Sequence, residues 1–211
     1  MNTFLKTLLD TTGIDIEHLK TEYLSEDEIL YLDGALKSLK DFESDFYSCT
    51  NGDRLEVLLQ FFSVHKSDII ALLNNKSKES TLTHLYTSDV ISASYDCFRF
   101  DLSKFPKLYQ SRNQVLTLYR IGRVDESAEN LGCSWSKTFD GLNAFIQSSS
   151  ISEGVLTKRP IFEVQVHDSV VLFSGSDKEQ ELVLQAGFNF KTLKLLDTKK
   201  IIENSKINIH V

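Results

Sequence analysis

The chain of 211 residues carries 30 acidic and 23 basic side chains, which gives a formal net charge of −7, and 41% of its residues are hydrophobic. These values are typical of a globular protein with a sizeable core, so they exclude a disordered chain. The acidic balance disfavours nucleic acid as a general partner, because a phosphate backbone repels negative charge.

The first hundred residues are predicted to be helical. Apolar residues recur three and four positions apart over residues 15–24, 26–42 and 53–76. Ser25 and Glu28 have the spacing of a capping box, and Asn74 predicts the end of the third segment. Nothing in this region has the pattern of a catalytic motif. The five histidines of the chain are scattered without an HExxH motif, so no metal site is predicted.

The pattern changes near residue 110, where short β-rich runs separated by turn residues begin. A helix is predicted over 137–147, and residues 161–166 and 170–175 are predicted to form a hairpin around His167-Asp168, a turn pair rather than a catalytic dyad. Strands are predicted at 115–120, 131–136, 161–166, 170–175, 180–187, 188–196 and 206–211. The chain therefore predicts an α+β fold, with a helical region at 1–110 and a β-rich region at 111–211.

The sequence gives three indications of the compartment. The three cysteines, Cys49, Cys97 and Cys133, are odd in number and widely spaced, which fits neither a disulfide framework nor a zinc site. No apolar run reaches the roughly 18 residues that a membrane helix needs, and the N-terminal stretch is too short for a signal peptide. A reducing cytoplasm, without a membrane partner, is the expected location.

Two patterns in the β-rich region suggest a site. Arg120 follows Tyr119 at the end of an apolar run, where an arginine either faces solvent or acts as a fixed cation for a phosphate or carboxylate. Alternate residues of a strand share a face, so Ser134 and Ser136 should point one way and Trp135 the other way, into the core. The serine hydroxyls are then free to hold another polar group in position.

A third pattern is the pair Glu179 and Glu181, which precedes an apolar strand. Two carboxylates at positions i and i+2 of one strand share a face and lie roughly 7 Å apart, so they repel each other unless they bind a cationic group. A solvated charged loop is the alternative interpretation of this pair.

Taken in order, these residues resemble the arginine–serine–glutamate class of ADP-ribosyltransferases, which includes many bacterial toxins and phage enzymes. The resemblance covers about residues 112–211 and rests on Tyr119-Arg120, on Gly132 ahead of Ser134-Trp135-Ser136, and on Glu179-Gln180-Glu181. It implies two small packed β-sheets with a cleft that holds NAD. Trp135 departs from the usual threonine, and only 14 positions separate Arg120 from Ser134, where larger toxins place a helix.

The resemblance also implies roles for these residues. Arg120 would contact NAD near its phosphates and nicotinamide ribose, with Arg112 or Arg123 as alternatives. Ser134 would hold the catalytic glutamate. Glu181 would bind the ribose 2′-hydroxyl and stabilise positive charge as nicotinamide leaves, while Glu179 would orient the nucleophile. Further NAD contacts are implied for Tyr119, Ser136 and Phe139.

The implied activity is mono-ADP-ribosylation of a macromolecule, with NAD as the donor substrate. A glutamate at the first position of the Glu-x-Glu motif accompanies arginine as the acceptor in this family, so protein is favoured over nucleic acid. Such an enzyme would act in the cytoplasm, including that of a host cell, as a toxin, an effector or a phage host modifier, and an antitoxin or inhibitor is a further partner. The alternatives are ADP-ribosylation of nucleic acid and a non-enzymatic interaction module, either an inactive transferase fold or an unrelated α+β protein.

Overall fold

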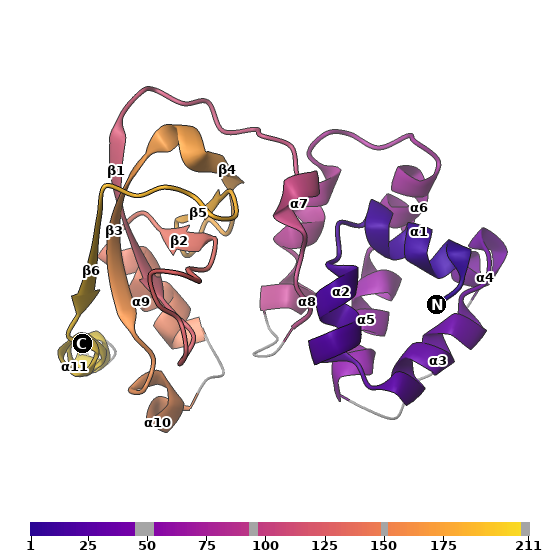
Figure 1. Cartoon of the computed structure of the whole chain (residues 1–211), viewed down its shortest axis with the longest axis horizontal. Helices are drawn as coiled ribbons and strands as arrows, with labels where there is room; N and C mark the ends of the chain where they lie inside the picture. The colour runs from indigo at the N-terminus through magenta and orange to yellow at the C-terminus, as the bar shows by residue number, and fades with distance from the viewer. Residues whose placement is uncertain (45–52, 93–96, 149–151, 208–211) are drawn as a thin grey trace. The chain divides into compact units, whose positions relative to one another are not determined.

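The chain divides into two compact units in this computed structural model, which describes residues 1–44, 53–92, 97–148 and 152–207. The helical unit comprises Met1–Pro106 and the sheet unit Lys107–Val211, so the division falls just before the expected boundary at residue 110 (Figure 1). Helices make up the first unit, and the second combines helices with one antiparallel sheet. The protein is therefore an α+β protein.

Short helices form the helical unit. They are α1 (Thr3–Thr11), α2 (Ile16–His18), the π-helical turn η1 (Leu19–Tyr23), α3 (Glu26–Ala35), α4 (Leu39–Glu43), α5 (Asp53–Val64), α6 (Lys66–Leu73), α7 (Thr81–Tyr86), α8 (Asp89–Ser92) and the 3-10 turn η2 (Leu102–Lys104). The predicted capping box is confirmed at the start of α3. The Ser25 backbone amide donates to Glu28 Oε2 at 2.8 Å, and the Glu28 amide donates to Ser25 Oγ at 3.3 Å.

Two of the predicted helices are each broken in two. The segment 26–42 is interrupted after α3, because Ser38 accepts a hydrogen bond from the Asp41 amide at 3.3 Å and so starts α4. The segment 53–76 is interrupted at His65 and ends at Asn74, as predicted; the next residue, Asn75, has a φ of +53°. These breaks let short helices surround a core of leucine and phenylalanine side chains that includes Leu5, Leu8, Phe61 and Phe62.

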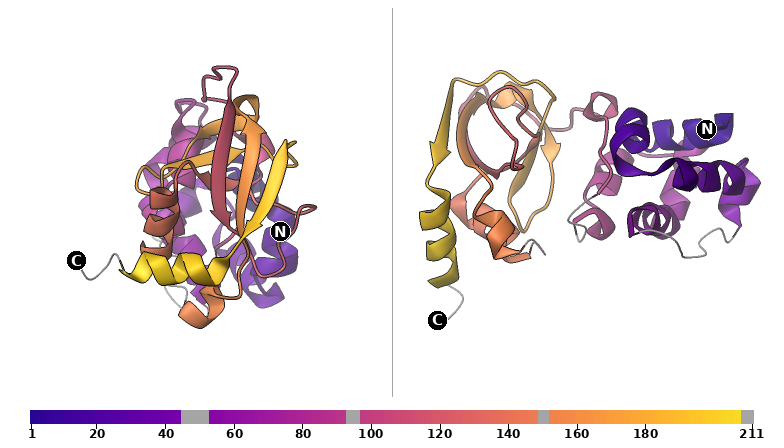
Figure 2. Two further views of the ribbon diagram at one scale, coloured as in Figure 1. Left: turned by 90° about the vertical axis from the view of Figure 1, so that its left-hand side faces the viewer. Right: turned by 60° about the horizontal axis from the view of Figure 1, so that its bottom comes forward.

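The sheet unit contains one six-stranded antiparallel sheet with the strand order β4-β5-β2-β1-β3-β6. Its elements are β1 (Val115–Ile121), β2 (Ser134–Ser136), α9 (Phe139–Ser148), α10 (Glu153–Leu156), β3 (Ile161–His167), the 3-10 turn η3 (Asp168–Val170), β4 (Val171–Ser174), β5 (Glu181–Leu184), β6 (Thr192–Leu196) and α11 (Thr198–Ile207). The resemblance implied two packed sheets, but the described strands are joined by hydrogen bonds into one. Figure 2 shows that this sheet is strongly curved.

The predicted hairpin of residues 161–166 and 170–175 is wrong. β3 lies between β1 and β6, whereas β4 pairs with β5 at the opposite edge of the sheet. The buried Asp168 follows β3 directly, and its carboxylate accepts hydrogen bonds from Ser111 Oγ at 2.5 Å and from the Arg112 amide at 2.7 Å. Burial opposes ionisation, but these hydrogen bonds hold the pKa of Asp168 below its usual value.

The strand predicted at residues 206–211 is also wrong for residues 206 and 207, the part of this segment that the structure describes. Residues 206 and 207 belong to α11, and residues 208–211 lie outside the described part of the chain. Ile202 of α11 is buried with Leu142 of α9 and Ile161 of β3, so α11 contributes an apolar side chain to this core. Figure 2 shows α11 as the last helix of the chain.

The two faces of the sheet bury different cores. Trp135, Phe162 and Leu182 belong to the core on one face, as expected for an inward-pointing tryptophan, and Trp135 is only 1% exposed. Ile121 and Ile161 belong to the core on the other face, together with α9 and α11. Because successive residues of a strand point to opposite faces, each strand of the sheet supplies side chains to both sides.

Within the part of the chain that the structure describes, none of the helices combines the length and apolar character that crossing a membrane requires.

Candidate active site

Tyr119, Ser136 and Glu181 form a row across three neighbouring strands. Ser136 of β2 pairs with Tyr119 of β1 on one side and with Glu181 of β5 on the other. Paired residues of an antiparallel sheet point to the same face, with Cβ atoms about 4.5–5.5 Å apart. The row therefore brings a serine, a phenol and a carboxylate together on the sheet face that α9 covers.

Glu181, the first residue of β5, is held in place at 8% exposure. Its Oε2 accepts a hydrogen bond from the Ser176 amide at 2.8 Å, and its own amide donates to the Ser176 carbonyl at 2.9 Å. A side chain at Gly175 would overlap the Glu181 carboxylate and force it to move. The turn of residues 175–180 thus fixes the direction of this carboxylate.

Glu179 lies in the turn before β5, so the prediction that it shares a strand face with Glu181 is wrong. Gln180, between them, has a φ of +48° and breaks the extended conformation. The turn is anchored to the start of α9, because the Lys137 amide donates to the Gln180 carbonyl at 3.0 Å and Thr138 Oγ1 donates to Gln180 Oε1 at 3.0 Å. The Glu179 carbonyl packs so closely on α9 that Gly141 has no room for a side chain.

The turn nevertheless keeps the two carboxyl groups electrostatically close. Burial and the neighbouring charge of Glu181 raise the pKa of Glu179 to about 7. A carboxyl group with this pKa exchanges a proton near neutral pH, a property that is common at catalytic sites.

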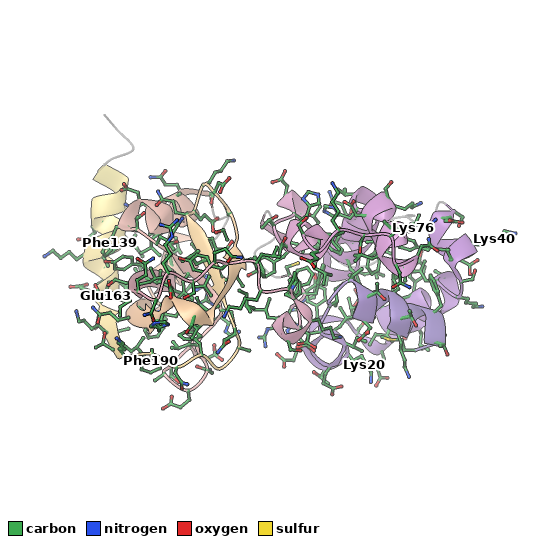
Figure 3. All side chains as sticks on the ribbon, turned by 90° about the horizontal axis from the view of Figure 1, so that it is seen from above. Lys20, Lys40, Lys76, Phe139, Glu163 and Phe190 are labelled. Atoms are coloured by element: carbon green, nitrogen blue, oxygen red, sulfur yellow. The ribbon has the colours of Figure 1, made fainter. Side chains whose placement is uncertain are left out.

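At the end of the row opposite Glu181, the ring of Tyr119 packs against that of Phe139. The rings of Tyr119 and Phe139 lie 4.3 Å apart between centroids at an interplanar angle of 39°, and Phe139 is 40% exposed. Tyr119 also pairs with Glu163 of β3, and Glu163 Oε1 lies 2.7 Å from Lys194 Nζ. Phe139 and Glu163 are labelled in Figure 3. Burial and the Glu163 charge raise the pKa of Tyr119, and Lys194 opposes them, so Tyr119 stays a neutral phenol at pH 7.

Arg120 points to the opposite face of the sheet, because it follows Tyr119 on β1. Its Nε and Nη2 donate to the two carboxylate oxygens of Glu126 at 2.7 and 3.1 Å, and its Nη1 donates to the Ser134 carbonyl at 2.9 Å. A side chain at Gly132 would overlap the guanidinium group. The structure thus places Arg120 behind β2 and outside the row.

Glu126, the buried partner of Arg120, is a residue that the sequence analysis did not identify. Its side chain is fully buried and also accepts hydrogen bonds from the amides of Arg123 at 3.0 Å and Gly132 at 2.8 Å. Burial alone would raise the pKa of Glu126, but the hydrogen bonds and charge of Arg120 outweigh it and lower the pKa. An acidic residue in a polar loop carries no sequence signal of burial, so only the fold identifies it.

The remaining predicted residues are placed as follows. Ser134 pairs with Val183, two positions further along β5, so it is Ser136 and not Ser134 that lies directly opposite Glu181. Arg123 joins the Glu126 cluster, with its Nε 3.8 Å from Glu126 Oε2. Arg112 precedes β1, at the end of the strand remote from Tyr119.

The raised pKa of Glu179 predicts how the free energy of unfolding of the sheet unit depends on pH. Glu179→Gln is expected to stabilise the sheet unit by about 1–3 kcal/mol above pH 7, since one pKa unit corresponds to about 1.4 kcal/mol. Near pH 4.5 the substitution should have little effect on the free energy of unfolding. The folded state keeps this proton up to about pH 7 whereas the unfolded chain loses it near pH 4.5, so the wild type loses stability as the pH rises between these values.

Urea unfolding followed by Trp135 fluorescence measures the effect, because this single tryptophan of the chain lies in the core of the sheet unit. Glu203→Gln, at an exposed position of α11, is the matched control. An equal stabilisation at both pH values would contradict the electrostatic explanation.

Comparison with known proteins finds no match. No protein-family model, no curated protein and no solved structure matches this chain. The resemblance to ADP-ribosyltransferases therefore stays a prediction based on the motif residues.

Proposed function

We propose that this protein is a mono-ADP-ribosyltransferase that transfers ADP-ribose from NAD to a macromolecular acceptor. One observation carries the proposal: the buried and oriented Glu181 lies opposite Ser136, which pairs in turn with Tyr119, and a second carboxyl group, Glu179, is electrostatically close to Glu181. This arrangement combines a fixed negative charge, hydroxyl groups and an exposed aromatic ring from three strands and a helix. The motif residues of the resemblance supply most of it.

The chemistry of the transfer needs a fixed carboxylate. The bond between C1′ of the ribose and the nicotinamide nitrogen breaks, nicotinamide leaves with the electron pair, and C1′ acquires positive charge. In the proposal, Glu181 accepts a hydrogen bond from a ribose hydroxyl and stabilises this charge. The Ser176 amide holds the carboxylate in position beforehand, at 2.8 Å, so little reorganisation is needed during the reaction.

The second carboxyl group, that of Glu179, is suited to binding the acceptor and removing its proton. A nucleophilic nitrogen forms a bond to C1′ and loses a proton, and Glu179, with a pKa of about 7, is able to take up that proton and to orient a guanidinium group. An arginine side chain of a protein is therefore the proposed acceptor. The net charge of −7 also favours a protein over a nucleic acid.

The geometry suggests specific roles for four residues. Ser136, directly opposite Glu181, takes the role of holding the catalytic glutamate that the resemblance gives to Ser134. The Tyr119–Phe139 pair offers an aromatic surface for the nicotinamide ring. Arg120 acts from behind the sheet by holding the Ser134 carbonyl, and so positions β2.

The test uses the full chain, NAD labelled in its adenylate part, and a bacterial lysate. We expect label on macromolecules together with release of free nicotinamide. Label that protease removes identifies a protein acceptor, and label that only nuclease removes identifies a nucleic acid. If neither label nor nicotinamide appears, the proposal is overturned. A transferase of this kind would serve as a toxin, an effector or a phage host modifier.

A further inference from the structure

The helical unit brings together three side chains that can bind a metal ion. His65 lies between α5 and α6, Asp68 is in the first turn of α6, and His84 comes from α7. One potential ligand atom from each lies within 4.8 Å of the others. Asp68 Oδ2 lies 4.0 Å from His65 Nδ1 and 3.7 Å from His84 Nε2.

We propose that His65, Asp68 and His84 bind one divalent transition-metal ion, and that zinc is the best match. Two imidazole nitrogens and one carboxylate oxygen form a ligand set that zinc accepts, whereas magnesium and calcium prefer oxygen ligands throughout. Three protein ligands leave the fourth position of a tetrahedral ion open to water or another ligand, as in catalytic zinc sites.

The distances fit a site that closes around the ion. Zinc–ligand bonds of about 2.0–2.1 Å in a tetrahedral arrangement place the ligand atoms about 3.3 Å apart. The two distances from Asp68, 3.7 and 4.0 Å, exceed this by less than 1 Å. The side chains of His84 and Asp68 are 66% and 46% exposed, so they are able to move inward, while His65, at 8%, stays fixed.

His65 also has the outer hydrogen bond that orients a metal-binding histidine. Its Nε2 lies 2.6 Å from Ser88 Oγ, and its ring packs 5.1 Å from that of Phe61. When Nε2–H donates to the serine, Nδ1 carries the lone pair, and Nδ1 is the nitrogen on the Asp68 side. This contact comes from a buried serine that is not one of the three ligands, and it can fix the tautomer and orientation of the ring as the outer hydrogen bonds of metal-binding histidines do.

The alternative explanation is a set of weak ion pairs at the start of α6 that needs no metal. The two explanations differ for His84, which belongs to another helix and is mostly exposed. An exposed histidine contributes little to the fold as an ion-pair partner, because surface pairs are worth at most about 1 kcal/mol. As a metal ligand, it is essential for affinity.

The experiment titrates Zn²⁺ into the full chain, freed of any affinity tag and pretreated with a chelator, in competition with a chromogenic zinc chelator. We expect one tightly bound ion per chain, absorption of four-coordinate Co²⁺ when cobalt replaces zinc, and no competition from excess Mg²⁺. A chain that binds no zinc at this stoichiometry would overturn the proposal. This result would leave the proposed transferase activity untouched.

Variants separate the site from adventitious binding. Ser88→Ala, which removes the outer hydrogen-bond partner, is expected to weaken zinc binding by roughly 10–100-fold. His84→Asn removes a ligand and is expected to weaken zinc binding by more than this factor. His167→Asn is the matched control, because His167 also lies next to a carboxylate, with its Nδ1 3.6 Å from Asp168, but belongs to the sheet unit. Unchanged zinc affinity in His84→Asn, with circular dichroism like that of the wild type, would also overturn the proposal.

Discussion

Replacing Glu181 by glutamine is expected to lower the rate of nicotinamide release from NAD by a factor of at least about 10²–10³, the usual effect of removing one preorganised electrostatic group. Glutamine has nearly the same shape and keeps an oxygen that can accept from the Ser176 amide, so the turn before β5 should stay in place. Only the negative charge is lost, and in the proposed mechanism that charge stabilises the developing cation. Initial rates at saturating NAD, measured by chromatography of free nicotinamide, give the factor.

The control for this variant is Glu203→Gln, which removes a carboxylate from an exposed position of α11. We expect it to leave the rate within about twofold of the wild type, because distant exposed charges are screened by salt. Trp135 fluorescence, which reports the core of the sheet unit, verifies that both variants are folded. If Glu181→Gln retained the wild-type rate while folded, Glu181 would have no catalytic role and the proposed function would fail.

Replacing Glu126 by alanine is expected to lower the free energy of unfolding of the sheet unit by about 3–5 kcal/mol, the usual cost of breaking a buried ion pair from one side. The substitution leaves Arg120 without its bidentate partner at a position where its side chain is only 16% exposed. It also removes the acceptor of the Arg123 and Gly132 amides. The loop between β1 and β2 should therefore lose its anchor.

Urea unfolding followed by Trp135 fluorescence measures this loss in the sheet unit. Lys194→Ala, which breaks the exposed pair with Glu163, is the matched control and should cost at most about 1 kcal/mol. The double variant Arg120→Ala, Glu126→Ala should cost less than the sum of the single variants, because the two side chains interact directly. A loss below 1 kcal/mol in Glu126→Ala would show that the ion pair contributes little.

The Glu126 ion pair also has a defined response to acid. The folded-state pKa of Glu126 lies below its ordinary value of 4.5, so its stabilisation is fully present above pH 4.5 and is lost as the pH falls through the folded-state pKa. Glu126→Ala should therefore flatten the acid limb of the stability profile. This dependence is opposite in sign to that of Glu179, whose raised pKa makes the folded sheet unit less stable as the pH rises towards 7.

Local patterns in the sequence determined several features correctly. The Ser25–Glu28 spacing predicted a capping box, which forms because both partners lie within one turn of the same helix. The alternation in Ser134-Trp135-Ser136 predicted opposite faces for the indole and the hydroxyls, because side-chain direction in a strand depends only on position. In both cases the interacting groups are a few residues apart.

Other features depended on contacts between distant segments. Sequence proximity favoured a β3–β4 hairpin, but the buried Asp168 binds Ser111 and the Arg112 amide, and β4 pairs with β5 instead. The strand predicted at 206–211 is part of α11 where it is described, and Ile202 of that helix packs with residues of α9 and β3. A single sequence contains no record of such partners.

The sites show the same division. Residue type and order along the chain are local properties, so the sequence alone predicts the candidate site residues of β1, β2 and β5. The folded structure was needed to show that Ser136 faces Glu181, that Arg120 turns away to bind Glu126, and that His84 lies beside His65 and Asp68. Strand register and burial follow from the packing of the whole unit, so the partners of a charged side chain become known only once the chain is folded.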